Sequence, residues 1–195
     1  MNKEPKYKVN FDEATHTYKD ESGLVYPSVS QILKAVGVIN TQFSNENSMN
    51  FGSVLHKTLQ LLDENNLGEY DMKLRLWVKQ YQKFLKEVNP IYDLIEQPLI
   101  SKLWGFAGTL DRLAGNVLVD LKTGNHYPHH ELQLSLYAVL VEENYGIKIK
   151  EQYALYIWEE CYKYLPLPNK RTVALGCVSL YKWLKEKGKN GNQSN

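Results

Sequence analysis

The chain has 195 residues, of which 43% are hydrophobic and 12% aromatic, and its formal net charge is +1. This composition is that of one folded domain with a sizeable core, and it excludes a disordered chain. No apolar run reaches the roughly 20 residues that a membrane helix needs, so we expect no membrane partner. The charged first ten residues lack the apolar segment of a secretory signal, which favours a cytoplasmic location.

The chain contains two cysteines, Cys161 and Cys177. They are too few for a four-cysteine zinc or iron–sulfur site, so we expect no iron–sulfur cluster. The near-neutral charge gives no global sign of nucleic-acid binding. A local basic groove around an acidic site would nevertheless cancel in this sum.

The first 50 residues predict a small β region followed by a short helix. Three strands are expected, at residues 7–11, 16–18 and 24–26. Ser28 is an N-cap residue, and Gln31 three positions later completes a capping box, so a helix begins there. Gly37 ends this helix, and residues 41–50 are polar and irregular.

The rest of the chain alternates helical and strand patterns. Apolar residues at helical spacing predict helices at 51–65, 71–88, 128–145 and 169–187. Strands are expected at 92–103, 106–114, 117–122, 150–158 and 161–165. This order predicts a mixed α/β fold in which helices flank a central mixed β-sheet. We expect a single domain over residues 1–195, with an extension at 1–50, a core at 51–166, and a C-terminal helix with a flexible tail at 167–195.

Gly115 and Asn116 lie between two strand patterns and are typical of a two-residue type II′ hairpin. This turn pairs Ala114 with Val117, and the same register places Asp111 directly opposite Asp120. Two bare carboxylates at that spacing repel each other, whereas a divalent cation between them reverses the sign of the interaction.

Lys122 lies two residues after Asp120, so it shares the same strand face. Two acids and a lysine therefore converge on one spot, and oxygen ligands favour Mg²⁺ or Mn²⁺. The alternative interpretation is a solvated strand face on which opposed charges have no function. The hairpin alone leaves both interpretations open.

Five short motifs follow one another in the chain. They are Gly52-Ser53-Val54-Leu55-His56, then Glu96 on the strand before Gly108-Thr109-Leu110-Asp111, then Asp120-Leu121-Lys122, and then Gln133-Leu134-Ser135-Leu136-Tyr137. Together they resemble the RecB-like branch of the PD-(D/E)XK nucleases. The segment from Tyr26 to Leu33 is similar to one in cluster-free phage exonucleases and mitochondrial genome-maintenance exonucleases.

The resemblance implies a restriction-endonuclease-like core and a metal-dependent deoxyribonuclease. It implies catalytic roles for Asp111, Asp120, Lys122 and Glu96. It implies that the metal ligands are His56, Asp111, Asp120 and the backbone carbonyl of Leu121. It further implies contacts to DNA from Gln133, Tyr137, Thr123 and Ser28.

The implied substrate is DNA, as a single strand or as duplex ends. An exonuclease fits 195 residues better than a site-specific endonuclease, because no separate specificity domain is apparent. A non-catalytic DNA-binding module on the same fold stays open, as do a homo-oligomer and a recombination or replication partner. The phage-like segment implies a phage or prophage origin, with roles in DNA recombination and repair.

Two further groups of residues attract attention. His126, His129 and His130 cluster at a loop-to-helix junction, where exposure or a phosphate contact is expected and a zinc site is not. The C-terminal segment interleaves basic and aromatic residues, which suits either the binding of single-stranded DNA or a solvated helix face with the aromatic residues in the core. These residues are Tyr162, Lys163, Tyr164, Lys170, Arg171, Tyr181, Lys182, Trp183, Lys185 and Lys187.

Overall fold

The computed structural model describes residues 4–39 and 46–191 of the chain. A small antiparallel sheet comes first, formed by β1 (Asn10–Asp12), β2 (Thr17–Lys19) and β3 (Val25–Tyr26). The main sheet has the order β4-β5-β6-β7-β8. Its strands are β4 (Leu94–Ser101), β5 (Phe106–Ala114), β6 (Val117–Lys122), β7 (Glu151–Ile157) and β8 (Tyr162–Pro166).

Strands β6 and β7 run parallel, and all other neighbours in the main sheet are antiparallel. Helix α4 (His129–Tyr145) is the crossover that parallel neighbours require. The predicted central mixed sheet is therefore confirmed, and so is the order of its elements.

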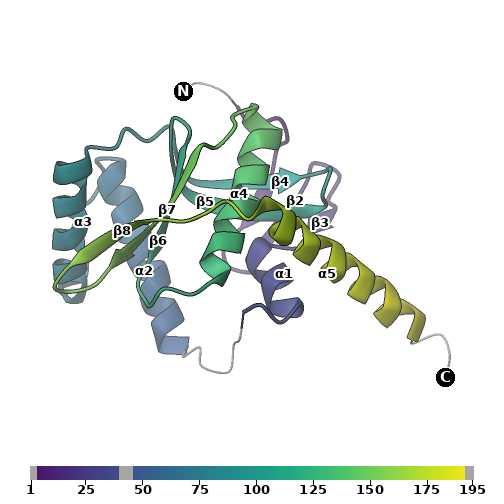
Figure 1. The fold of residues 1–195 in the computed structure, drawn as a ribbon. Helices are drawn as coiled ribbons and strands as arrows, with labels where there is room; N and C mark the ends of the chain where they lie inside the picture. Colours follow the sequence, from purple (N-terminus) through teal and green to yellow (C-terminus); the bar gives the residue numbers. More distant parts are fainter. Residues whose placement is uncertain (1–3, 40–45, 192–195) are drawn as a thin grey trace.

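Helices cover both faces of the main sheet (Figure 1). On one face lies α4, against which α1 (Val29–Ala35) and the first half of α5 (Arg171–Gly191) pack. On the other face lie α2 (Glu46–Asp63), the short 3₁₀ helix η1 (Met72–Leu74) and α3 (Arg75–Val88). The sheet thus separates two apolar cores, and α4 is buried on nearly all sides.

Strand β6 contributes to both cores. Leu118 packs on the α4 side, whereas Val119 and Leu121 pack on the side of α2 and α3. Alternate residues of a strand point to opposite faces, so this strand is buried on both. The chemistry-bearing residues of β6 therefore lie inside the protein.

The hairpin between β5 and β6 has the predicted register, with Ala114 paired to Val117. Gly115 has a φ of +60°, and Asn116 is not among the described residues with positive φ, as a type II′ turn requires. The N-cap at Ser28 and its capping box with Gln31 are also confirmed.

Some boundaries differ from the prediction. Helix α2 begins at Glu46 and not at residue 51, so the second half of the segment expected to be irregular is helical; residues 41–45 lie outside the described residues. Helix α5 continues to Gly191, well into the predicted tail. The tail's last four residues, 192–195, lie outside the described residues as well.

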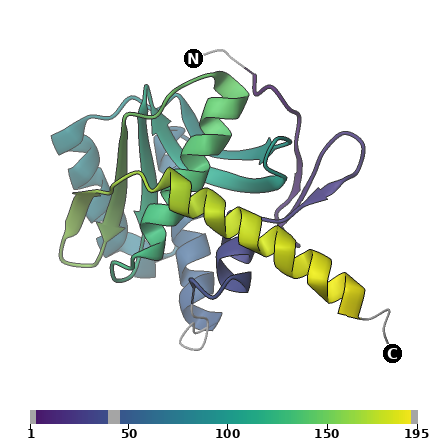
Figure 2. The same cartoon turned by 45° about the vertical axis from the view of Figure 1, so that its right-hand side comes forward.

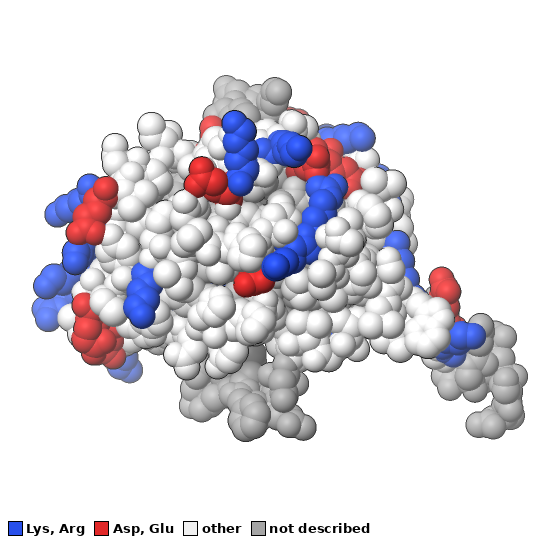
Figure 3. All heavy atoms as spheres, viewed as in Figure 1, with Lys and Arg blue, Asp and Glu red and all other residues white. Residues whose placement is uncertain are grey.

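Helix α5 leaves the body of the protein as an extended rod (Figure 2). Ala174 and Val178 are buried against the body, but Trp183 further along is 52% exposed. On the face seen in Figure 3, acidic and basic side chains lie side by side with broad uncharged areas between them. No helix within residues 4–39 and 46–191 is both long and apolar enough to cross a membrane.

Gly108 on β5 allows the close approach of two neighbours. A Cβ atom built there would lie 2.7 Å from a ring carbon of Tyr137 and 3.2 Å from a methyl group of Val29. Both neighbours are buried, so neither can move away freely. We expect Gly108→Ala to lower the free energy of unfolding by about 1–3 kcal/mol through overpacking.

Urea unfolding followed by circular dichroism measures this effect. Gly68→Ala is the matched control, because no atom of residues 4–39 or 46–191 lies within 4 Å of the Cβ built at Gly68. Its expected change is within about 0.5 kcal/mol. Equal stability of Gly108→Ala and the wild type would contradict this account of the close approach.

Candidate active site

The hydrogen-bond ladder between β5 and β4 skips Asp111, and the ladder between β5 and β6 ends just before it. The register places Glu96 of β4 on one side of it and Asp120 of β6 on the other, but neither is a ladder partner of Asp111 among the described strands. Instead, Asp111 Oδ2 accepts a hydrogen bond of 2.6 Å from the backbone N–H of Leu121. A carboxylate therefore takes the place of strand pairing, and the sheet opens around it.

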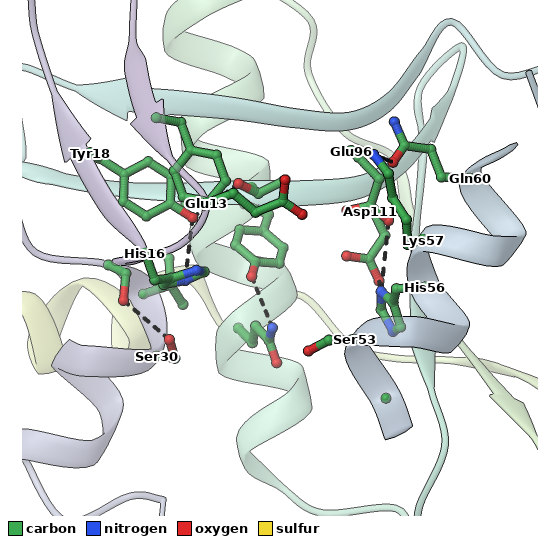
Figure 4. A pocket seen from close by; sticks show the side chains of 18 of the residues that line it. Glu13, His16, Tyr18, Ser30, Ser53, His56, Lys57, Gln60, Glu96 and Asp111 are labelled. Carbon is green, nitrogen blue, oxygen red and sulfur yellow. Dashed lines mark hydrogen bonds and ion pairs between the residues drawn. The ribbon is translucent and has the colours of Figure 1, made fainter. Parts of the chain in front are cut away.

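Three side chains with metal-ligand atoms meet at this opening (Figure 4). His56, Glu96 and Asp111 each present one such atom, and these atoms lie within 4.8 Å of one another. His56 Nδ1 is 3.7 Å from Glu96 Oε1 and 3.7 Å from Asp111 Oδ2. This is the one group of its kind within the described part of the chain.

Asp120 lies beside this group but outside it. Its carboxylate forms an ion pair with Lys122 Nζ, and its buried Oδ1 has no hydrogen-bond partner among the described residues. An unsatisfied buried carboxylate oxygen is costly in an apolar interior. Its chemistry fits a cation held jointly with the neighbouring donors.

Burial distinguishes between the two interpretations of the hairpin. The exposed fractions of Asp111 and Asp120 are 7% and 1%. The two acids are therefore not on a solvated face, and that interpretation is wrong. Their burial needs compensation from partners, protons or a metal.

Burial of these charged groups shifts their pKa values. Burial raises the pKa of Asp120 to about 6, and Asp111 adds to the shift while Lys122 opposes it. Burial also raises the pKa of Asp111, and Glu96 adds to that shift. Burial lowers the pKa of His56, but the charges of Asp111 and Glu96 outweigh it and the net shift is upward.

Arg112 was not anticipated from the sequence. Its side chain is fully buried, and its Nε lies 2.6 Å from Asp63 Oδ2 while its Nη1 lies 2.8 Å from Glu96 Oε1. Asp63 in turn accepts a hydrogen bond of 2.7 Å from the hydroxyl of Tyr81. An arginine between apolar residues near the end of a buried strand is the one signal in the sequence for this network.

This network fixes Glu96 in an unusual conformation. Glu96 has a φ of +45°, in the left-handed region that residues other than glycine rarely adopt. Such a conformation costs on the order of 1–3 kcal/mol and persists only where the surroundings impose it. The ion pair with Arg112 is the contact that holds the Glu96 carboxylate beside Asp111.

The site opens into a groove with a volume of about 660 Å³. Lys122 lines it, and so do the predicted DNA-contacting residues Thr123, Gln133 and Tyr137. Gln133 Nε2 donates a hydrogen bond of 2.9 Å to the Tyr137 hydroxyl, so the two side chains share one helix face as expected.

Ser28, the fourth of these residues, also lines the groove but is only 2% exposed. Its hydroxyl accepts a hydrogen bond of 3.1 Å from the backbone N–H of Gln31. The side chain of Ser28 is therefore engaged in capping α1. Contact with DNA through Ser28 stays a prediction.

The histidine cluster differs in part from expectation. His130 is buried, and its Nδ1 lies 2.7 Å from the Tyr156 hydroxyl, so exposure is wrong for this residue. Burial lowers the pKa of His130 to about 2, which keeps the imidazole neutral. His126 is exposed and His129 half-buried.

The C-terminal aromatic residues are divided between the core and the surface. Tyr162 and Tyr164 pack against Phe84 of α3, as the core interpretation of these residues predicted. Trp183 is exposed on α5, and no α5 residue lines the groove within the described residues.

Comparison with known proteins gives structural matches only. No protein-family model matches the chain, and no curated protein matches its sequence. A crystal structure of a protein from Eubacterium rectale, described there as a "Putative exonuclease", aligns with a TM-score of 0.62 at 15% identity. The alignment covers 85% of this chain and 82% of that one.

An alkaline exonuclease from Laribacter hongkongensis aligns with a TM-score of 0.39 at 12% identity, over 85% of this chain and 94% of that one. The likeness to the Eubacterium rectale protein shows a shared fold. It confirms the predicted fold class and, at the level of fold, the resemblance drawn from the motifs.

The Arg112 network makes a prediction about stability. Arg112→Met leaves the buried Asp63 carboxylate and the half-buried Glu96 carboxylate without their partner, and we expect the free energy of unfolding to fall by about 3–5 kcal/mol. Arg171→Met is the matched control, because Arg171 pairs with Glu142 on the surface, where both side chains are more than a third exposed. A surface pair contributes about 0–1 kcal/mol. Similar losses for both variants in urea unfolding would contradict the positioning role of Arg112.

Asp120 makes a prediction about pH. A folded-state pKa raised to about 6 means that this group stabilises the fold at low pH, and that this contribution is lost as pH rises through about 6. In metal-free buffer at pH 8, Asp120→Asn is therefore expected to be more stable than the wild type by about 1–3 kcal/mol. The gain should shrink as pH falls through 6 and vanish only below about pH 4, where Asp120 is protonated in both the folded and the unfolded protein.

Asp20→Asn is the control with the opposite sign. Hydrogen bonds, foremost from the Ser22 hydroxyl, lower the pKa of Asp20 to about 2. Its substitution should therefore destabilise the protein at pH 8. Thermal unfolding of both variants at about pH 4 and at pH 8 checks the pair. A loss of stability in metal-free Asp120→Asn at pH 8 would contradict the assignment.

Proposed function

We propose that this chain is a Mg²⁺- or Mn²⁺-dependent deoxyribonuclease that hydrolyses phosphodiester bonds and acts as an exonuclease on linear or single-stranded DNA. The observation that carries the proposal is the placement of buried acids, His56 and Lys122 at one opening of the sheet, on a groove of about 660 Å³. Structural ion pairs alone do not account for an unsatisfied buried carboxylate oxygen on Asp120.

In this proposal His56, Glu96, Asp111 and Asp120 hold the cation, together with the backbone carbonyl of Leu121. When bound, the cation polarises the phosphoryl oxygen and lowers the pKa of a water molecule. Carboxylate oxygens suit both Mg²⁺ and Mn²⁺, and the imidazole nitrogen of His56 favours Mn²⁺ of the two.

Lys122 has two tasks in the proposal. Its Nζ now neutralises Asp120 and also lines the groove, so it lies where a scissile phosphate would enter. Once a cation shares the charge of Asp120, the ammonium group can orient the attacking water or stabilise charge on the phosphate. Gln133, Tyr137 and Thr123 then contact the DNA backbone from the neighbouring groove wall.

An endonuclease and a non-catalytic DNA-binding module are the rivals. The description of the Eubacterium rectale protein as an exonuclease, when carried over to this chain, favours the exonuclease. The presence of Asp111, Asp120 and Lys122 together disfavours a binding module, because such a module has no need of buried acids. We further propose that the enzyme acts in the cytoplasm of a bacterium or phage-infected cell, in DNA recombination or repair. A homo-oligomer stays open.

The test is cleavage of end-labelled linear DNA, single- and double-stranded, beside a closed circular single strand, with Mn²⁺, Mg²⁺ or EDTA. We expect loss of linear DNA while the circle is spared, and at least about a 100-fold drop in rate for Asp120→Ala and Lys122→Ala. Lys83→Ala, an exposed lysine on α3 outside the groove, is the matched control and should retain full activity. Cutting of the circle would replace the exonuclease with an endonuclease, and full activity of folded Asp120→Ala would overturn the proposed site.

A further inference from the structure

The small N-terminal sheet forms one wall of the groove that holds the candidate active site. Phe11, His16 and Tyr18, from β1, β2 and the loop between them, line the same groove as His56 and Asp111. In Figure 4, His16 and Tyr18 lie on one side of the cavity, and His56, Glu96 and Asp111 lie on the other. The role of this wall is not explained by metal binding.

The three rings form one ordered set. Phe11 and Tyr18 are stacked, with ring centroids 4.5 Å apart. The His16 ring meets both of them edge-on at 5.4 Å. Tyr18 is buried and its hydroxyl lies 2.9 Å from the Thr109 hydroxyl of β5, so the set is fixed to the main sheet.

His16 is the exposed member of the set, and its backbone is strained. It has a φ of +51°, a conformation that glycine adopts without cost. Histidine adopts this backbone conformation less favourably than glycine, and the residue here carries a ring at the edge of the groove. Such outliers cluster at ligand-binding sites. Burial lowers the pKa of His16, with Lys34 adding to the shift, so the imidazole is neutral at pH 8.

The opposite wall has a different chemistry. Helix α2 presents Ser53, Lys57 and Gln60 to the groove, and Lys122 lies beyond them. The tip of the β1–β2 loop carries Glu13, which repels phosphate. A nucleic-acid backbone is therefore favoured along the α2 side, and its bases are then directed toward the aromatic wall.

We propose that His16, backed by Phe11 and Tyr18, is a base-stacking subsite for an unpaired nucleobase of the DNA strand that enters the active site. Base–aromatic stacking needs an exposed base face and tolerates any sequence. Bases inside a duplex are covered by their neighbours, so the subsite selects single strands and frayed ends. This inference rests on the proposed nuclease function and names the substrate class of that site.

The test is binding without cleavage, by fluorescence anisotropy in EDTA at pH 8. Two labelled probes of equal length and charge are compared: an oligothymidylate and the same backbone with abasic sites. Stacking contributes roughly 1–3 kcal/mol per base, equivalent to a roughly 5- to 100-fold tighter Kd for the oligothymidylate. His16→Asn should abolish this preference and leave binding of the abasic probe unchanged.

The choice of variants separates stacking from folding. Asparagine tolerates the left-handed conformation, so His16→Asn removes the ring while keeping the loop. His16→Phe restores a ring without a nitrogen, and it should restore the preference for the oligothymidylate. Equal binding of both probes by the wild type, an equal loss on both probes in His16→Asn, or no recovery in His16→Phe would overturn the subsite.

Failure of this subsite is distinguishable from failure of the nuclease proposal. If the wild type cleaves linear DNA but does not prefer the oligothymidylate, the nuclease stands and the subsite falls. If the preference is present and depends on the ring while no metal supports cleavage, the subsite stands and the nuclease proposal falls.

Discussion

The burial of several carboxylates at one position of a β-sheet is the constraint on which the rest of this structure depends. The ladder between β5 and β4 skips Asp111, the ladder between β5 and β6 ends just before it, and Asp111 accepts a hydrogen bond from the backbone N–H of Leu121. Buried Arg112 compensates the charge of Glu96 on one side of Asp111, and Lys122 compensates the charge of Asp120 on the other. The compensation is incomplete, as the pKa of Asp120 near 6 indicates. Opening the sheet in this way lowers the stability of the fold, but it creates a position at which a bound cation is favoured.

The packing of two apolar cores offsets this loss of stability. Strand β6 is anchored on one face by α4 and on the other by α2 and α3, and it stays paired with β7 from Val117 to Lys122 although its pairing with β5 ends before Asp111. The same packing positions the groove. Gly108 lets the Tyr137 ring approach β5 closely, which places the Tyr137 hydroxyl and Gln133 beside the acids. The stability of the fold and the geometry of the site therefore depend on the same contacts.

The sequence predicted best what local chemistry determines. The boundaries of β5 and β6 and their register follow from the Gly115–Asn116 turn and were right. The interrupted ladder was not predictable, because it arises from a side chain that replaces a backbone partner. The Arg112–Asp63 pair joins residues 49 apart in the chain, and no local pattern reports such a contact. His130 was wrongly expected to be exposed, because Tyr156, its buried partner, lies on another element.

The predicted N-terminal extension is built into the main body of the protein. Ser28 forms a β-bridge to Ala107 of β5, and the Tyr18 hydroxyl lies 2.9 Å from that of Thr109. Both contacts fall next to Gly108 and within four residues of Asp111, so the small sheet is held in register with the acids. A wall tied this closely to the main sheet keeps a fixed position relative to the candidate metal ligands. Such a fixed position is what a site needs if it is to recognise a base and act on the neighbouring phosphate.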